Sequence, residues 1–490
     1  MEPMREDSTV QLPCGLLRGA RVPVPGGAQV LRFTAIPYAA APAGPLRWRP
    51  PQPAPAWIGV RDATQFGPDL PQVPGPLIRG NGQSEDALHL NVWTPDLQPR
   101  QPLPVIVWLH GGGFVSGSGT DPRADGARLC AEGAVVVNVS YRTGLFGFLA
   151  HPALSGESPQ RTSGNYGLLD QLAALRWVRD NIAAFGGDAA RVTLAGVSAG
   201  SASISLFLTS PQARGLFDRA ILHSPGAGRP LATLEDAERA GRELGDDIEA
   251  LRALDAAALL EKTGMLTPKV RGLTTPRVLR PIVDGWLLPL QDREAFRIGA
   301  FTRLPIIVGS NLDEGSMLTR DWPVRDLASY GDLVRRNFGE AASQVMALYP
   351  ARTDADVRGR VAELFADTQF NYGTRLIAQS MAGRGQPTFR YLFLRRRPGR
   401  ADGPQHGEEV AHVFGNFGTN PVDALDEQLS SVLRRTWVRF AATGDPNGGG
   451  APRWEPYDPA ADNHLAFGDT IAPGRAWRAA QLDFLEHYCG

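Results

Sequence analysis

Short runs of consecutive apolar residues recur along the chain, and each has the length of a β-strand. They occupy residues 103–109, 134–139, 192–195, 304–309 and 388–394. A strand that is apolar on both sides is suited to burial on both faces, as in the centre of a parallel sheet covered by helices. The runs therefore predict the core of a largely parallel sheet.

Between these runs the sequence has the spacing of helices. In LLDQLAALRWVRDNIAAFGG, leucine and isoleucine recur at near-helical intervals, and the closing pair Gly186-Gly187 is typical of a helix end. Strands that alternate with helices indicate an α/β fold. We expect a central, mostly parallel sheet flanked by helices.

The domain organisation follows from where this alternation is interrupted. Residues 232–262 and 325–383 have a more purely helical pattern, and we expect them to be insertions that cover one end of the sheet. The first hundred residues are rich in Pro and Gly and predict short strands and loops. No repeat or Gly/Ser linker divides the chain, so residues 8–490 are interpreted as a single domain.

Charge and composition exclude several classes of function. The formal net charge is −1 and there is no basic run, so we expect no nucleic-acid partner and no anionic membrane partner. No apolar run approaches the roughly 18 residues of a membrane helix, and the first residues lack a secretory signal pattern. Cys14, Cys130 and Cys489 have no metal or redox spacing, which favours a cytoplasmic protein.

The segment RVTLAGVSAGSASISLFL places a serine between a strand pattern and a helix pattern. In its G-x-S-x-G turn, Gly196 and Gly200 permit a sharp bend, and the Ser198 hydroxyl would project from the edge of the sheet. The Ala199 N–H would then lie at the start of a helix, where negative charge is stabilised. The pentapeptide alone is a weak signal, and an ordinary tight turn is the alternative.

A second glycine motif, HGGGF at residues 110–114, directly follows an apolar run. Consecutive glycines cost chain entropy, but they let backbone N–H groups face a site without obstruction by side chains. Together with Ala199, Gly112 and Gly113 would form an oxyanion hole. A flexible loop is the alternative interpretation.

A serine nucleophile requires a base and an acid that orients the base. In this architecture the chain order is serine, acid, histidine. His406 follows the last apolar run and is the candidate base, with His412 as the alternative, and His223 is expected to be structural. Asp313 and Glu314 are both candidates for the acid. The histidines have no accompanying ligand cluster, so no metal is expected.

Beyond these motifs, the sequence resembles the type-B carboxylesterases, the family of bacterial para-nitrobenzyl esterases and cholinesterases. The resemblance extends from about residue 15 to residue 454. It is carried by RFTAIPYAAAPAGPLRWRPP, SEDALHLNVWTP, HGGGF, YRTGLFGFL, GNYGLLDQLAALRWVRDNI, GVSAG, SPQARGLFDRAILHS, PIVDGWLLP, NLDEGS, HGEEVAHVFG and FAATGDPN.

This resemblance implies an α/β-hydrolase fold and assigns roles to individual residues. It implies Ser198 as nucleophile, Glu314 rather than Asp313 as the acid, and His406 as the base. The implied oxyanion donors are Gly112, Gly113 and Ala199, Ser224 supports the triad, and the implied structural ion pairs are Arg47 with Glu85 and Arg142 with Asp170.

Two departures from the family pattern bear on compartment and substrate. The family disulfide is absent, since Leu70 and Ala87 stand at its two positions, in agreement with a reducing compartment. Val197 replaces the glutamate that often precedes the nucleophile, so attraction of a choline-like alcohol is lost.

The resemblance also implies the lining of the substrate pocket, namely Phe114, Val197, Arg277, Arg280, Met317 and Leu318. Arg277 and Arg280 stand where cholinesterases have aromatic residues. Arginine there would pair with an acidic acyl group. The alternative is that both are surface residues of an arginine-rich chain.

The predicted function is hydrolysis of small-molecule carboxylic esters through an acyl-enzyme, without metal or organic cofactor. One alternative is an acyltransferase or cyclase that uses the same acyl-enzyme. A remote alternative is a non-catalytic interaction protein on the same fold. Whether the protein is a monomer or a dimer is left open by the sequence.

Overall fold

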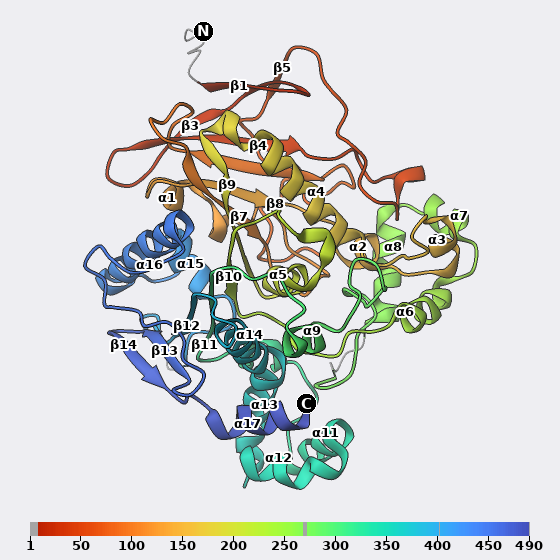
Figure 1. The fold of residues 1–490 in the computed structure, drawn as a ribbon. Helices are drawn as coiled ribbons and strands as arrows, with labels where there is room; N and C mark the ends of the chain where they lie inside the picture. The colour runs from red at the N-terminus through yellow and green to blue at the C-terminus, as the bar shows by residue number, and fades with distance from the viewer. Residues whose placement is uncertain (1–7, 268–271, 401, 490) are drawn as a thin grey trace.

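A mixed eleven-stranded sheet is the framework of the computed structural model, which describes residues 8–267, 272–400 and 402–489. The sheet crosses the molecule in Figure 1. Its strands, in spatial order, are β14 (Ile471–Arg475), β13 (Asn463–Phe467), β12 (Thr388–Phe393), β11 (Ile306–Asn311), β10 (Arg219–His223), β9 (Gly187–Val197), β7 (Leu103–Leu109), β8 (Val135–Val139), β6 (His89–Thr94), β4 (Gln29–Pro37) and β3 (Ala20–Pro23).

The strands from β8 to β13 in this order run parallel, and the outer strands at both edges pair antiparallel. The predicted apolar runs overlap β7, β8, β9, β11 and β12, all of which carry buried residues. Because parallel strands end at the same edge, residues that follow β7, β9 and β11 meet there. The fold is therefore the predicted α/β class with a mostly parallel sheet.

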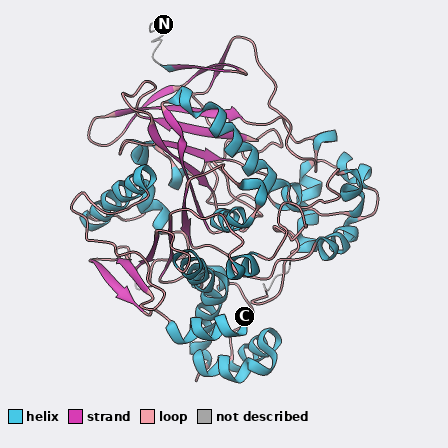
Figure 2. Cartoon of the chain, in the orientation of Figure 1, coloured by secondary structure: helices cyan, strands magenta, loops and turns pink. Residues whose placement is uncertain are grey.

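Helices cover both faces of this sheet (Figures 1 and 2). Alternate residues of β7 enter two different hydrophobic clusters, Val105 and Val107 in one, Ile106 and Trp108 in the other. The first cluster contains side chains of α4 (Tyr166–Asn181), α5 (Ala199–Thr209) and α14 (Tyr372–Ala382). The second contains side chains of α1 (Ala127–Cys130), α15 (Glu409–Phe414) and α16 (Ala424–Thr443).

The two segments expected to be helical insertions are helical in the structure. The first contains α6 (Leu234–Gly241), α7 (Ile248–Ala253) and α8 (Ala256–Thr263). The second contains α11 (Leu327–Phe338), α12 (Ala342–Leu348), α13 (Asp354–Ala366), a π-helix (Asp367–Asn371) and α14. The second segment does more than cover an end, since α14 packs against β11 and β12.

The remaining elements lie around this framework. A small sheet contains β1 (Thr9–Leu12), β2 (Gly15–Arg18) and β5 (Val60–Asp62). The other α-helices are α2 (Gly144–Phe148), α3 (Pro152–Glu157), α9 (Asp292–Ile298), α10 (Ser316–Thr319) and α17 (Ala479–Tyr488). Within the described ranges, no helix is both long and apolar enough to cross a membrane.

Both expected ion pairs are present. The Arg142 guanidinium donates to Asp170 at 2.7 and 2.8 Å, with both side chains buried. Arg47 donates to Glu85 through Nε at 2.8 Å and also through Nη2. The Arg142–Asp170 pair joins a loop to α4, and the Arg47–Glu85 pair joins two loops. Both connections agree with a role in folding.

Candidate active site

Ser198 lies at the turn between β9 and α5, with φ of 57° and ψ of −115°. This positive φ is an uncommon conformation for a residue with a side chain. The turn also requires close approach of backbone on both sides. A Cβ at Gly200 would lie 2.1 Å from the Leu109 carbonyl oxygen, and one at Gly196 would lie 2.8 Å from the same atom. The glycines thus allow the bend that presents Ser198 at the edge of the sheet.

The HGGG loop follows β7 and lies next to this turn. Gly112 has φ of 116°, and a Cβ there would lie 2.0 Å from the Ser116 carbonyl oxygen. A Cβ on Gly111 would lie 3.2 Å from that of Ser198. Gly112 and Gly113 line one cavity together with Ser198 and Ala199. Glycine is therefore required where the loop approaches the serine.

Glu314 follows β11, and its buried carboxylate is held on both oxygens. Oε1 accepts hydrogen bonds from Ser224 Oγ and from the Asn311 N–H, both at 2.6 Å. Oε2 accepts a hydrogen bond from His406 Nδ1. A proton fixed on Nδ1 leaves His406 Nε2 as the basic nitrogen. Within the described residues, this buried Nε2 has no hydrogen-bond partner.

His406 and Ser198 line the same cavity, which has a volume of about 270 Å³. The Phe370 ring lies against the imidazole, with 4.3 Å between ring centroids and 30° between planes. The cavity thus contains the serine, the basic nitrogen and the glycine backbone of two motifs. This set of groups can carry out acyl transfer.

The rejected candidates have other partners. The Asp313 carboxylate accepts from the N–H of Ser316, the first residue of α10, at 2.9 Å. His412 lies in α15 and contacts Asp426 at 3.1 Å. His223 is buried, with Tyr391 Oη at 2.8 Å, and burial lowers its pKa to about 3. These side chains therefore have partners outside the set of Ser198, Glu314 and His406.

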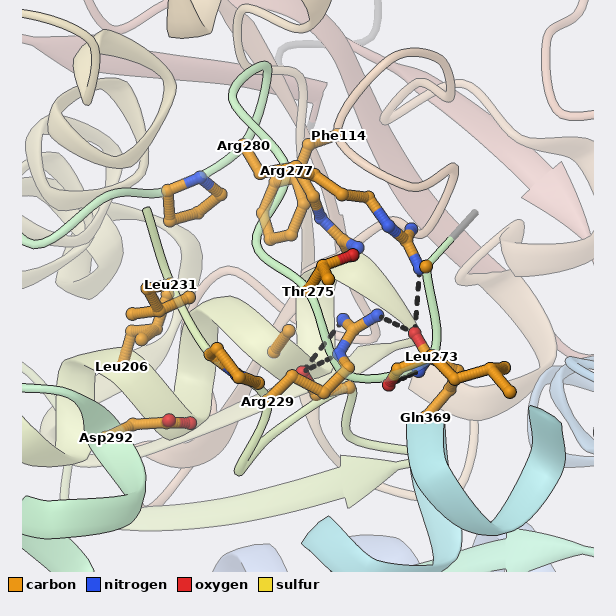
Figure 3. A pocket seen from close by; sticks show the side chains of 15 residues that line it. Phe114, Leu206, Arg229, Leu231, Leu273, Thr275, Arg277, Arg280, Asp292 and Gln369 are labelled. Carbon is orange, nitrogen blue, oxygen red and sulfur yellow. Dashed lines mark hydrogen bonds between the residues drawn. The ribbon is translucent and has the colours of Figure 1, made fainter. Parts of the chain in front are cut away.

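Not all pocket residues predicted from the sequence lie in one cavity. Val197, Arg277, Arg280, Met317 and Leu318 line the cavity with Ser198. Phe114 instead lines an adjoining smaller pocket, which also contains Arg277 and Arg280. Figure 3 shows this pocket with both arginines among its lining residues, and both side chains are partly buried.

Several residues near the site were missed by sequence reasoning. Glu409 is buried beside Asn311, whose amide donates to it. Burial and the nearby Glu314 carboxylate raise the pKa of Glu409 to about 7. The sequence feature that could have pointed to Glu409 is the pair of consecutive glutamates in HGEE, close to His406. Arg229 and Gln369 line the pocket of Figure 3, but they belong to no recognisable sequence motif.

The described residues contain no cluster of His, Cys, Asp or Glu that is suited to hold a metal ion. Cys14, Cys130 and Cys489 are free thiols. Leu70 and Ala87, at the positions of the family disulfide, are buried in the same hydrophobic cluster.

Comparisons with known proteins agree with the arrangement. A family model described as "Carboxylesterase family" matches residues 6–485. A fumonisin B1 esterase of Sphingopyxis macrogoltabida is 44% identical over 457 residues, covering 90% of this chain and 84% of the relative. A para-nitrobenzyl esterase of Bacillus subtilis is 34% identical, covering 85% and 87%. Rat carboxylesterase 1C is 32% identical, covering 96% and 91%.

Proposed function

Because this chain belongs to the carboxylesterase family and is a carboxylic ester hydrolase with an α/β-hydrolase fold, we propose that Ser198 is its nucleophile. Ser198 attacks the ester carbonyl, and His406 Nε2 takes its proton. Glu314 keeps the imidazole in the required tautomer and stabilises its charged form. The supporting observation is the hydrogen bond from His406 Nδ1 to a Glu314 carboxylate that Ser224 also holds.

The reaction then proceeds in two steps. The backbone N–H groups of Gly112, Gly113 and Ala199 stabilise the oxyanion of the tetrahedral intermediate. His406 donates its proton to the leaving alcohol, and the acyl group remains on Ser198. Water, activated by His406, releases the acid. No cofactor is part of this scheme.

The test is hydrolysis of para-nitrophenyl esters, from acetate to dodecanoate, by the wild type and by Ser198→Ala. The variant should lose activity by at least about 10⁴-fold, because the covalent step is abolished. Circular dichroism controls for folding. Retained turnover in a folded Ser198→Ala variant would overturn the assignment. A stoichiometric acyl-enzyme that water releases only slowly would favour acyl transfer over hydrolysis.

We also propose that this is a bacterial, cytoplasmic enzyme that acts on small-molecule esters. The free thiols and the apolar pair at the family disulfide positions support a reducing compartment. We propose a single domain over residues 8–490, although positions such as 401 and 490 lie outside the described residues. The support is that residues from the HGGG loop to His406 line one cavity.

A further inference from the structure

We propose that the acyl group of the substrate carries a free carboxylate, which binds Arg229, Arg277 and Arg280. This set is called the arginine cluster below. The inference rests on the proposed function, because it places the carboxylate on the acyl side of the ester that Ser198 attacks. The substrate class is therefore esters of dicarboxylic or polycarboxylic acids in which at least one carboxylate remains free.

The first observation is that the arginine cluster is held in a defined arrangement. Gln369 Oε1 accepts from Arg229 Nη1 at 2.6 Å and from Arg277 Nη2 at 2.8 Å (Figure 3). The Arg280 guanidinium lies over the Phe114 ring, 5.2 Å from its centroid. The neutral Gln369 amide and the Phe114 ring help to hold these guanidinium groups in place. The planar guanidinium groups are suited to bind a carboxylate through two hydrogen bonds.

Gly226 provides room for one member of the cluster. Its carbonyl oxygen accepts from Arg229 Nε at 3.0 Å and Nη2 at 2.9 Å. A Cβ on Gly226 would lie 2.4 Å from Nη2. Gly226 lines both the catalytic cavity and the adjoining pocket. The backbone here is therefore arranged around the guanidinium of Arg229.

The second observation is the charge of the catalytic cavity. All three arginines of the cluster line it together with Ser198. Arg123 lines it too, and pairs with Asp121 at 2.8 Å. No aspartate or glutamate occurs among the described lining residues of this cavity. Positive charge gathered in a partly enclosed space raises the affinity for an anion.

One acidic side chain, that of Asp292, is among the described lining residues of the adjoining pocket. The Asp292 carboxylate accepts from Ser205 Oγ at 3.2 Å and from the N–H groups of Gly228 and Arg293 at 3.1 and 2.8 Å. Burial raises its pKa. Figure 3 shows it apart from the arginine cluster, below Leu206. It lies in the wall of the pocket, where the charge of Arg229 lowers its pKa and so opposes the effect of burial.

The third observation distinguishes the acyl side from the alcohol side. A larger cavity of about 880 Å³ shares His406 and Met317 with the catalytic cavity, and its lining does not include the arginine cluster. His406 must give its proton to the leaving alcohol, so the alcohol lies on the side of His406. The arginine cluster then faces the acyl group, and the larger cavity accommodates the alcohol.

The experiment compares two esters with acyl chains of the same length, p-nitrophenyl hexanoate and mono-p-nitrophenyl adipate. They differ by the terminal carboxylate. Spontaneous hydrolysis is subtracted. We expect the wild type to prefer the half-ester in kcat/KM by roughly tenfold or more, because hydrogen bonds to a charged group are strong. High salt should reduce this preference.

Variants of the cluster then test the residues. Arg277→Gln and Arg280→Gln should each lower the ratio of half-ester to neutral-ester kcat/KM by roughly tenfold. Arg277→Lys should restore part of the ratio, since it keeps the charge without the planar fork. Arg453→Gln removes an equal charge from a side chain that is 80% exposed, outside this cavity, and should leave the ratio unchanged. Thermal melting checks that each variant is folded.

Binding gives a readout that does not depend on turnover. Adipate should bind the Ser198→Ala variant in calorimetry, and this binding should be weakened by adding Arg277→Gln. Hydrolysis of both esters with a ratio near one, or a ratio that the cluster variants do not change, would overturn the inference and leave the proposed function intact. If neither ester is hydrolysed, the proposed function fails, and the acyl-side assignment fails with it.

Discussion

At the scale of single residues, Glu314 differs from its neighbour Asp313 in what its carboxylate binds. Glu314 accepts from Ser224, Asn311 and His406, whereas Asp313 accepts from the first N–H of α10, that of Ser316. In Glu314→Gln, the amide cannot keep all three contacts and still hold the proton on Nδ1. We expect kcat for p-nitrophenyl butyrate to fall about 10²- to 10⁴-fold, with the protein still folded.

Asp313→Asn is the matched control, because it makes the same chemical change one position earlier in the chain. The amide oxygen can still accept from the backbone at the start of α10, so kcat should change by less than about threefold. A larger loss in Asp313→Asn than in Glu314→Gln would reverse the assignment of the acid.

At the scale of elements, the contact between β7 and the start of α5 sets the position of Ser198. A Cβ at Gly200 would meet the backbone at Leu109, which cannot move without shifting the strand. Gly200→Ala should therefore lower the free energy of unfolding by about 3 kcal/mol or more, measured in urea. Gly156, in α3, has no atom within 4 Å of such a Cβ. Gly156→Ala should be neutral or stabilise by up to about 1 kcal/mol. Equal effects of the two substitutions would contradict this account.

The central strands were predictable because strands buried on both faces must be apolar throughout. β7 matches the run 103–109 at both ends. β9 begins at Gly187, before its apolar run. Residues 188–191 are exposed or only partly buried, and two of them, Asp188 and Arg191, are charged. Apolarity identifies the buried part of a strand but not the part that continues past the core.

The π-helix Asp367–Asn371 was not predictable in the same way. It joins α13 to α14, and it brings the consecutive residues Gln369 and Phe370 to the arginine cluster and to His406. Such a widened turn depends on what packs around it, and local sequence gives no distinct signal for it. This is why sequence reasoning found His406 but missed the ring beside it.

At the scale of the whole molecule, the order of the motifs predicted which segments meet at the sheet edge. Glycine turns and the chain order of serine, acid and histidine have physical reasons that can be read in the sequence. No such reason in the sequence points to the arginine cluster, since Arg229 and Gln369 lie 140 positions apart in an arginine-rich chain. Arg277 and Arg280 were found only through the resemblance, which left open whether they face the pocket.

Glu409 links the site to the stability of the whole molecule. Its buried carboxyl has a pKa of about 7, raised by burial and by Glu314, so the folded protein holds a proton that the unfolded chain releases near pH 4.5. As pH rises from about 4.5 to about 7, this group therefore lowers the stability, and above pH 7 its cost is fully present.

Glu409→Gln removes that cost. Relative to the wild type, the variant should gain up to about 3 kcal/mol of unfolding free energy between pH 5 and pH 8, measured by urea denaturation at both values. A difference between the two proteins that does not change with pH would mean that Glu409 is ionised throughout this range, and that the contact with Asn311 offsets the cost of burying its charge.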